Sequence, residues 1–184
     1  MNREKALEIL KQNVQNKNLI KHCLAVESVM QVLACHFSED QEKWKLAGLL
    51  HDIDYEETKD SPEKHSLVGA EMLKELGVEK DICQAVKAHN EAHGEKPETL
   101  MEKTLFVSDP ITGLIVASTL VLPSKKLADL TVQNVLNRFK EKAFARGANR
   151  EIISKCEEYL NLNLKEFIKI VLNAMQSISD DLEL

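Results

Sequence analysis

Apolar residues recur along most of the chain at the three- and four-residue spacing that is typical of amphipathic helices. Between residues 18 and 37, for example, Val26, Val29, Leu33 and Phe37 fall on one stripe. A stripe of this kind buries one face of a helix against its neighbours. The pattern therefore predicts an all-α fold.

Capping residues, glycines and prolines divide this pattern into separate helices. The predicted helices cover residues 2–14, 18–37, 38–50, 61–77, 79–93, 98–122, 131–145, 149–160 and 163–178, with a loop at 55–60. Ser61-Pro62 is a start signal, because serine caps helices and proline is tolerated in the first helical turn. Pro110 must kink or restart the helix that contains it.

Composition agrees with a fold of few, long elements joined by short links. The 184 residues include 6 glycines and 4 prolines, which is about half of the usual share. This length predicts a single domain over residues 1–184. The sequence contains no run of about 18 apolar residues, so it predicts no membrane span. The first residues lack the apolar region of a signal peptide. We therefore expect a cytoplasmic protein.

Four histidines fall on helix faces that the periodicity directs inward: His22, His51, His65 and His89. A single histidine of this kind is usually a core residue with one hydrogen-bond partner. Four of them are costly to bury unless something satisfies them, and a divalent cation does so through neutral ring nitrogens. A helical protein with coincidental histidines stays open as the alternative.

Two carboxylates accompany these histidines. Asp52 directly follows His51 at the end of an apolar helix, and Asp109 ends the apolar run Leu105–Ser108. A buried, ionised aspartate needs a positive partner, and a metal ion is one answer. For Asp109, a helix cap is the other interpretation.

The order of these residues resembles that of the HD-domain superfamily of metal-dependent phosphohydrolases. The segments that carry the resemblance are KHCLAVESV, LAGLLHDID, KHSLVGAEML, AVKAHNEAH and LFVSDPITG. They cover a motif core at about residues 20–120, and the C-terminal helices of 124–178 include PSKKLADLTVQNVLNRFKEKAFARG, which is similar to small HD proteins. The resemblance implies a helical bundle with a central metal site and hydrolysis of a phosphate ester by activated water.

Carried over residue by residue, the resemblance implies two metal sites. The first is implied to contain His22, His51, Asp52 and Asp109. Asp52 is implied to bridge to a second site, which His65 and His89 complete. The resemblance also implies catalytic roles for His51 and Asp52. One or two ions of Mn, Fe, Co, Ni or Zn suit such ligands, and the residue types do not distinguish these metals.

Two positions depart from related family patterns. Asn90 stands where the HD-GYP branch has a further histidine, which argues against a third metal. Tyr55 stands where some nucleotidase members carry the glutamate of HDxxE, and Glu56 follows one residue later. We interpret Asp54, Glu56 and Glu57 as part of a solvated loop.

The formal net charge of -6 conceals a cationic segment. The acidic total argues against a general nucleic-acid binder, yet basic residues crowd between residues 125 and 150. Some of them are spaced to form one stripe on a helix, which suits phosphate; a solvated helix face is the other interpretation. We expect substrate contacts from Lys125, Lys126, Arg138, Lys142 and Arg146.

The leading hypothesis is a phosphomonoesterase or phosphodiesterase that acts on a nucleotide or another small phosphorylated metabolite. The alternative is a catalytically weak HD scaffold that binds a nucleotide or a partner as a sensor. Occupation of all six implied ligand positions favours catalysis. We expect neither a membrane nor a nucleic-acid partner, and the sequence leaves the oligomeric state open.

Overall fold

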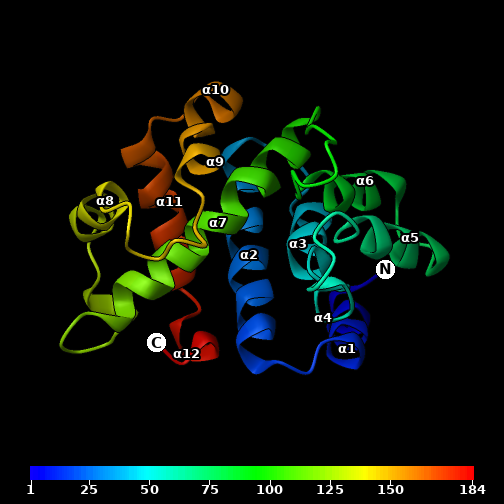
Figure 1. Cartoon of the computed structure of the whole chain (residues 1–184), viewed down its shortest axis with the longest axis horizontal. Helices are drawn as coiled ribbons and strands as arrows, with labels where there is room; N and C mark the ends of the chain where they lie inside the picture. The colour runs from blue at the N-terminus through cyan, green and yellow to red at the C-terminus, as the bar shows by residue number, and fades with distance from the viewer.

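A central helix organises the computed structural model, which describes residues 1–184 and contains helices but no strands. α2 (Lys17–His36) runs through the middle of the molecule (Figure 1). It contacts α3 (Gln41–Leu50), α7 (Leu100–Leu120) and α11 (Leu164–Gln176). The all-α prediction is confirmed. None of the helices combines the length and hydropathy needed to cross a membrane.

The other helices lie on either side of α2 (Figure 1). Those on the α3 side are α1 (Arg3–Asn13), α4 (Tyr55–Thr58), α5 (Leu67–Glu75) and α6 (Lys80–Ala88). Those on the α7 side are α8 (Val132–Lys140), α9 (Arg150–Ser154) and α10 (Cys156–Leu160). A 3-10 turn at Leu127–Asp129 follows α7, and α12 (Ser179–Leu182) packs on α2 near the C-terminus.

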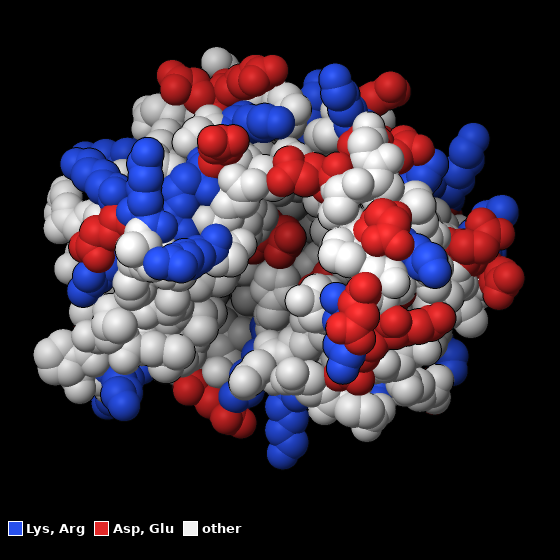
Figure 2. All heavy atoms as spheres, viewed as in Figure 1, with Lys and Arg blue, Asp and Glu red and all other residues white.

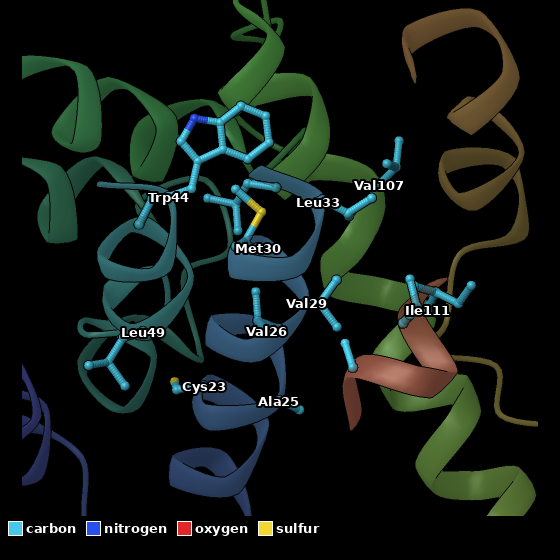
Figure 3. Packing of buried hydrophobic residues seen from close by; sticks show 14 of the residues in the cluster. Cys23, Ala25, Val26, Val29, Met30, Leu33, Trp44, Leu49, Val107 and Ile111 are labelled. Atoms are coloured by element: carbon cyan, nitrogen blue, oxygen red, sulfur yellow. The ribbon is translucent and has the colours of Figure 1, made fainter. Parts of the chain in front are cut away.

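A core of 46 buried apolar residues fills the space between these helices. In Figure 3, Trp44 of α3 lies beside Met30 of α2, and Val29 points from α2 toward Val107 and Ile111 of α7. Burial of each large apolar side chain contributes roughly 1.5–3 kcal/mol. The helices around α2 therefore form a rigid frame for the polar residues that lie between them.

Gly48 allows α3 to lie directly against α2. A Cβ atom built on Gly48 would lie 2.7 Å from the backbone oxygen of Val26, closer than real side chains approach. His51 follows Gly48 by three residues, and His22 precedes Val26 by one helical turn. The close helix contact therefore brings two histidine-bearing segments together.

Several predicted helix limits are wrong by a few residues. The side chain of Asn16, not Asn18, caps α2, and Asp40 caps α3, which does not begin at Ser38. In both cases the oxygen of the cap accepts backbone N–H groups of the first turn. The segment 55–60, predicted as a loop, contains the short helix α4.

The helix predicted from residue 61 begins only at Leu67, because a distant carboxylate binds its first amide groups. Asp54 accepts hydrogen bonds from the backbone N–H groups of Ser66 and Gly69, each at 2.8 Å. Ser66 itself has φ +70, which interrupts any helix that begins at Pro62. The local Ser-Pro signal is therefore overridden by a tertiary contact.

Three further predicted helices differ from those of the structure. α7 continues through Pro110 as one helix, so the proline does not restart it. The predicted helix 79–93 ends at Ala88, and the predicted helix 149–160 is divided at Lys155 into α9 and α10.

α8 ends at Lys140, five residues before its predicted end. The guanidinium of Arg150 donates hydrogen bonds to the carbonyl oxygens of Phe144, Ala145 and Ala148, each at 2.6 Å. These bonds hold the segment after α8 in a turn rather than a helix. The predicted stripe of cations along one helix is therefore wrong, since Lys142 and Arg146 lie outside α8.

Candidate metal centre

Four of the six predicted ligands meet where α2, the end of α3 and α7 come together. Nε2 of His22 lies 3.1 Å from Nε2 of His51 and 3.0 Å from Oδ1 of Asp109. Oδ2 of Asp52 lies 3.6 Å from His22 and 3.5 Å from His51. Donor atoms about 2.1 Å from one cation lie roughly 3 to 3.5 Å apart, so these four residues form a cluster of the right size for one metal ion.

The other two predicted ligands meet on the opposite oxygen of Asp52. Oδ1 of Asp52 lies 3.2 Å from Nε2 of His65 and 3.5 Å from Nε2 of His89. The two ring nitrogens are 3.2 Å apart. The two oxygens of Asp52 therefore face different histidine pairs, which is the arrangement of a carboxylate that bridges two cations.

Hydrogen bonds fix the orientation and the tautomer of each ring. Nδ1 of His51 donates to the carbonyl oxygen of Gly48 at 2.8 Å, and Nδ1 of His89 donates to that of Val86 at 2.6 Å. A carbonyl oxygen only accepts, so the proton of each neutral ring is on Nδ1. Nε2 therefore presents a lone pair.

Hydrogen bonds from Nδ1 also orient the rings of His22 and His65. Nδ1 of His22 donates to the hydroxyl of Thr112 at 3.1 Å, because that hydroxyl donates its own proton to the carbonyl oxygen of Asp109. Nδ1 of His65 donates to Oδ1 of Asp54 at 3.0 Å. In each case Nε2 again faces the cluster with a lone pair, which is how proteins orient histidine ligands of metals.

This donor set fits a divalent cation. Four nitrogen lone pairs and two carboxylates converge with no cationic side chain among them, and His51, Asp52 and His89 are buried. Nitrogen lone pairs and anionic oxygens this close repel one another unless a positive charge lies between them. The cluster is consistent with the metal site of an HD domain.

The carboxylates also attract protons to the rings. Burial lowers the pKa of His51, but Asp52 and Asp109 outweigh it and raise the pKa to about 9. Burial likewise opposes the charged form of His65, whereas Asp52 and Asp54 raise its pKa to about 10. Against the effect of their burial, the histidines hold the pKa values of Asp52 and Asp109 well below the usual range. Protons and a metal ion therefore compete for the same nitrogen atoms.

Comparison with known proteins agrees with this geometry. Residues 19–114 match the model of the HD domain family, and all six predicted ligands lie within that range. The chain belongs to the HD domain family. The family comprises phosphohydrolases that are typically metal-dependent, so the resemblance inferred from the sequence is confirmed.

The relatives of this HD domain include much longer proteins. It is 32% identical over 139 residues to ribonuclease Y of Lawsonia intracellularis, covering 74% of this chain and 26% of the relative. Ribonuclease Y of Nitratidesulfovibrio vulgaris strain DP4 is 32% identical over 142 residues, which cover 74% of this chain and 27% of the relative. An uncharacterised protein of Methanocaldococcus jannaschii is 38% identical over 102 residues, which cover 53% of this chain and 59% of the relative. The chain thus spans about a quarter of the length of the ribonuclease Y relatives.

Asp54 is the residue of this HD domain that the sequence interpretation missed. It was assigned to a solvated loop, but it is 1% exposed and accepts three hydrogen bonds, from His65, Ser66 and Gly69. It therefore positions His65 and caps α5. A second aspartate two residues after Asp52, with Ile53 between them, is the only local signal of this role.

A cavity of about 870 Å³ opens over the predicted ligands of the HD domain. Figure 2 shows the surface hollowed in the middle of this face, with acidic side chains at the base of the hollow. His22 and Asp109 are the most accessible residues of the first cluster, with side chains 23% and 31% exposed. The cavity also exposes Tyr55, Glu56 and Lys59 beside the histidines.

None of the five predicted substrate cations lines this cavity. Lysine and arginine side chains gather instead over α8 and its surroundings, at the left of Figure 2. The guanidinium of Arg138 forms an ion pair with Glu141 at 2.8 Å and lies over the ring of Phe144. A role for Lys125, Lys126, Arg138, Lys142 and Arg146 in anion binding stays a prediction.

Proposed function

We propose that this HD domain is a metal-dependent phosphohydrolase that cleaves a phosphate ester of a nucleotide or another small phosphorylated metabolite. The observation that carries the proposal is that two pairs of histidine Nε2 atoms face the two oxygens of Asp52. The proposed ligands of the first ion are His22, His51, Asp52 and Asp109. Those of the second ion are Asp52, His65 and His89.

The roles of the protein side chains follow from their contacts. When bound, a divalent cation makes water a better nucleophile and offsets the charge of phosphoryl oxygens. His51 and Asp52 would hold the cation in a fixed position, since both are buried and the carbonyl oxygen of Gly48 orients His51. Hydrolysis forms a bond from the water oxygen to phosphorus and breaks the ester P–O bond, and the leaving oxygen takes up a proton.

The position of the cavity gives a phosphate group access to the proposed ligands. The ligands lie at its base rather than beneath a closed surface, so a phosphate group reaches them directly from solvent. Mixed nitrogen and oxygen donors suit Mn, Fe, Co, Ni or Zn. Because two relatives are named as ribonucleases, phosphodiesters belong among the substrates to be tested beside phosphomonoesters.

A hydrolysis panel with metal analysis tests the proposal. Protein equilibrated with each of the five metals is assayed against nucleotides, sugar phosphates, cyclic and linear dinucleotides and short RNA. We expect turnover of at least one ester, at least 100-fold slower in Asp52→Ala and His51→Ala. Glu57→Gln is the matched control, since Glu57 is exposed. Tight ligand binding by metal-loaded protein without product would favour the sensor alternative instead.

A further inference from the structure

Two exposed residues that line the cavity over the predicted metal ligands have polar groups without a partner in the protein. Tyr55 and Lys59 are four residues apart on α4 and its C-terminal cap, and both line the cavity. Neither forms a side-chain hydrogen bond or an ion pair within the protein. Their polar groups are therefore available to a ligand that occupies the cavity.

Lys59 is the only lysine or arginine among the residues that line the cavity. The carboxylates of Glu56 and Glu91 line it as well, in addition to the ligands Asp52 and Asp109. A ligand with one phosphate group meets Lys59 and the metal centre. Each further phosphate group of a di- or triphosphate would have no additional cation and would approach these carboxylates.

Tyr55 is the only aromatic residue among the large apolar side chains that are exposed, at 45%. Its ring lies against that of His65, with the centroids 5.3 Å apart and the planes at 86°. An aromatic ring beside a phosphate site binds the organic part of the ligand most favourably when that part is planar, because the two rings stack. The free amide of Asn18, which also lines the cavity, offers hydrogen bonds to such a group.

We propose that Tyr55 and Lys59 recognise the substrate, and that this substrate is a monophosphate ester whose alcohol carries a planar ring. Lys59 contacts the phosphate group, and Tyr55 contacts the ring. The inference rests on the proposed function, since it assumes that the phosphate group lies at the metal centre. Both residues are positioned by α4, which directly follows the ligands His51 and Asp52.

Calorimetric binding to Mn²⁺-loaded protein separates the two roles with three probes that resist hydrolysis. These are methylphosphonate, the phosphonate analogue of AMP, and a methylene-bridged analogue of ATP. We expect wild type to bind the AMP analogue at least tenfold more tightly than either other probe. Tyr55→Ala should weaken the AMP analogue about tenfold and leave methylphosphonate unchanged, whereas Tyr55→Phe should stay within about twofold. An aryl phosphonate in place of the AMP analogue tells whether a ring suffices without the ribose.

Lys59→Gln should weaken both single-phosphonate probes about tenfold. Lys169→Gln, which removes an exposed lysine of α11, should change none of them. Metal content is measured for every variant, so that lost affinity is not mistaken for lost metal. Tightest binding of the ATP analogue would overturn the inference, and so would wild-type affinities in both Tyr55→Ala and Lys59→Gln. In either case, ester hydrolysis by the wild type would still support the proposed function. Failure of metal-loaded wild type to bind any probe would contradict both.

Discussion

The buried carboxylate of Asp54 accepts a hydrogen bond from Nδ1 of His65 at 3.0 Å. Its other oxygen accepts the backbone N–H groups of Ser66 and Gly69, so the carboxylate is fixed from three directions. This bond keeps Nε2 of His65 directed at Oδ1 of Asp52, 3.2 Å away. The orientation of His65 in the second histidine pair therefore depends on Asp54.

Asp54→Asn should weaken metal binding at the second site. An amide has only one acceptor oxygen, so it does not accept hydrogen bonds both from His65 and from the two backbone N–H groups. Loss of such an outer partner typically costs 10–100-fold in metal affinity, and we expect about tenfold here. The first site should retain its affinity, because Asp54 contacts none of its ligands. Metal titration of wild type and variant measures both affinities, with Glu57→Gln as the control. Equal losses at both sites would mean that Asp54 acts through general stability instead.

Gly48→Ala should destabilise the fold and lower metal content, because the new methyl group meets the backbone of Val26 at 2.7 Å. Overpacking of this kind costs about 1–3 kcal/mol. Separation of α3 from α2 also moves His51 away from His22. Urea denaturation measures the free energy of unfolding, and elemental analysis measures the metal.

Gly113→Ala is the matched control for this experiment. Gly113 is an exposed residue of α7, and a Cβ atom built on it has no neighbour within 4 Å. An alanine there should stabilise the helix by about 0.5–1 kcal/mol. Similar destabilisation by both substitutions would show that the close contact at Gly48 has no special importance.

Metal binding near pH 7 should release protons. The pKa of His51 is raised to about 9 and that of His65 to about 10 in the metal-free protein, so both rings are largely protonated at neutral pH. A metal ion must displace these protons from Nε2. Calorimetry in buffers of different ionisation enthalpy counts the protons released, and a count of zero would contradict the assigned pKa shifts.

The same shifts predict how the stability of the metal-free protein depends on pH. Both histidines have folded-state pKa values above the ordinary 6.5, so protons bind the folded state more tightly than the unfolded chain. Their stabilisation is fully present below about pH 6.5 and is lost as the pH rises through 9 to 10. Denaturation in EDTA between pH 6 and 9 should show this decline, and His65→Gln should make it shallower. Identical slopes for the two proteins would refute the assignment.

Thr112→Val should weaken the first metal site selectively. Valine keeps the shape of threonine but removes the hydroxyl that accepts the Nδ1 proton of His22 at 3.1 Å. We expect about a tenfold loss of metal affinity. Thr119→Val is the control, because the Thr119 hydroxyl is buried in the same helix and bonds only to Ile115 of α7. If the control loses as much affinity, the hydroxyl of Thr112 does not orient the ligand.

Much of the proposed ligand set could be predicted from the sequence because each histidine is spaced at helical intervals from apolar residues and His51-Asp52 ends an apolar helix. The spacing identified His65 although that residue lies before the start of α5. The role of Asp54 could not be predicted, because its neighbours Tyr55, Glu56 and Glu57 are typical of a solvated loop. Its burial depends on amide groups 12 and 15 residues further along the chain. The end of α8 was not predicted either, because the guanidinium of Arg150 donates hydrogen bonds to carbonyl oxygens five and six residues before it. Apolar periodicity carries no information about such hydrogen bonds from side chains to the backbone.

The central claim is that the two oxygens of Asp52 belong to two metal sites. An anomalous difference map from crystals grown with Mn²⁺ tests it most directly. We expect one peak about 2.2 Å from Nε2 of His22 and His51, and a second at the same distance from Nε2 of His65 and His89. Asp52 should contact both peaks through different oxygens. Absence of any peak between these residues in metal-saturated crystals would contradict the claim.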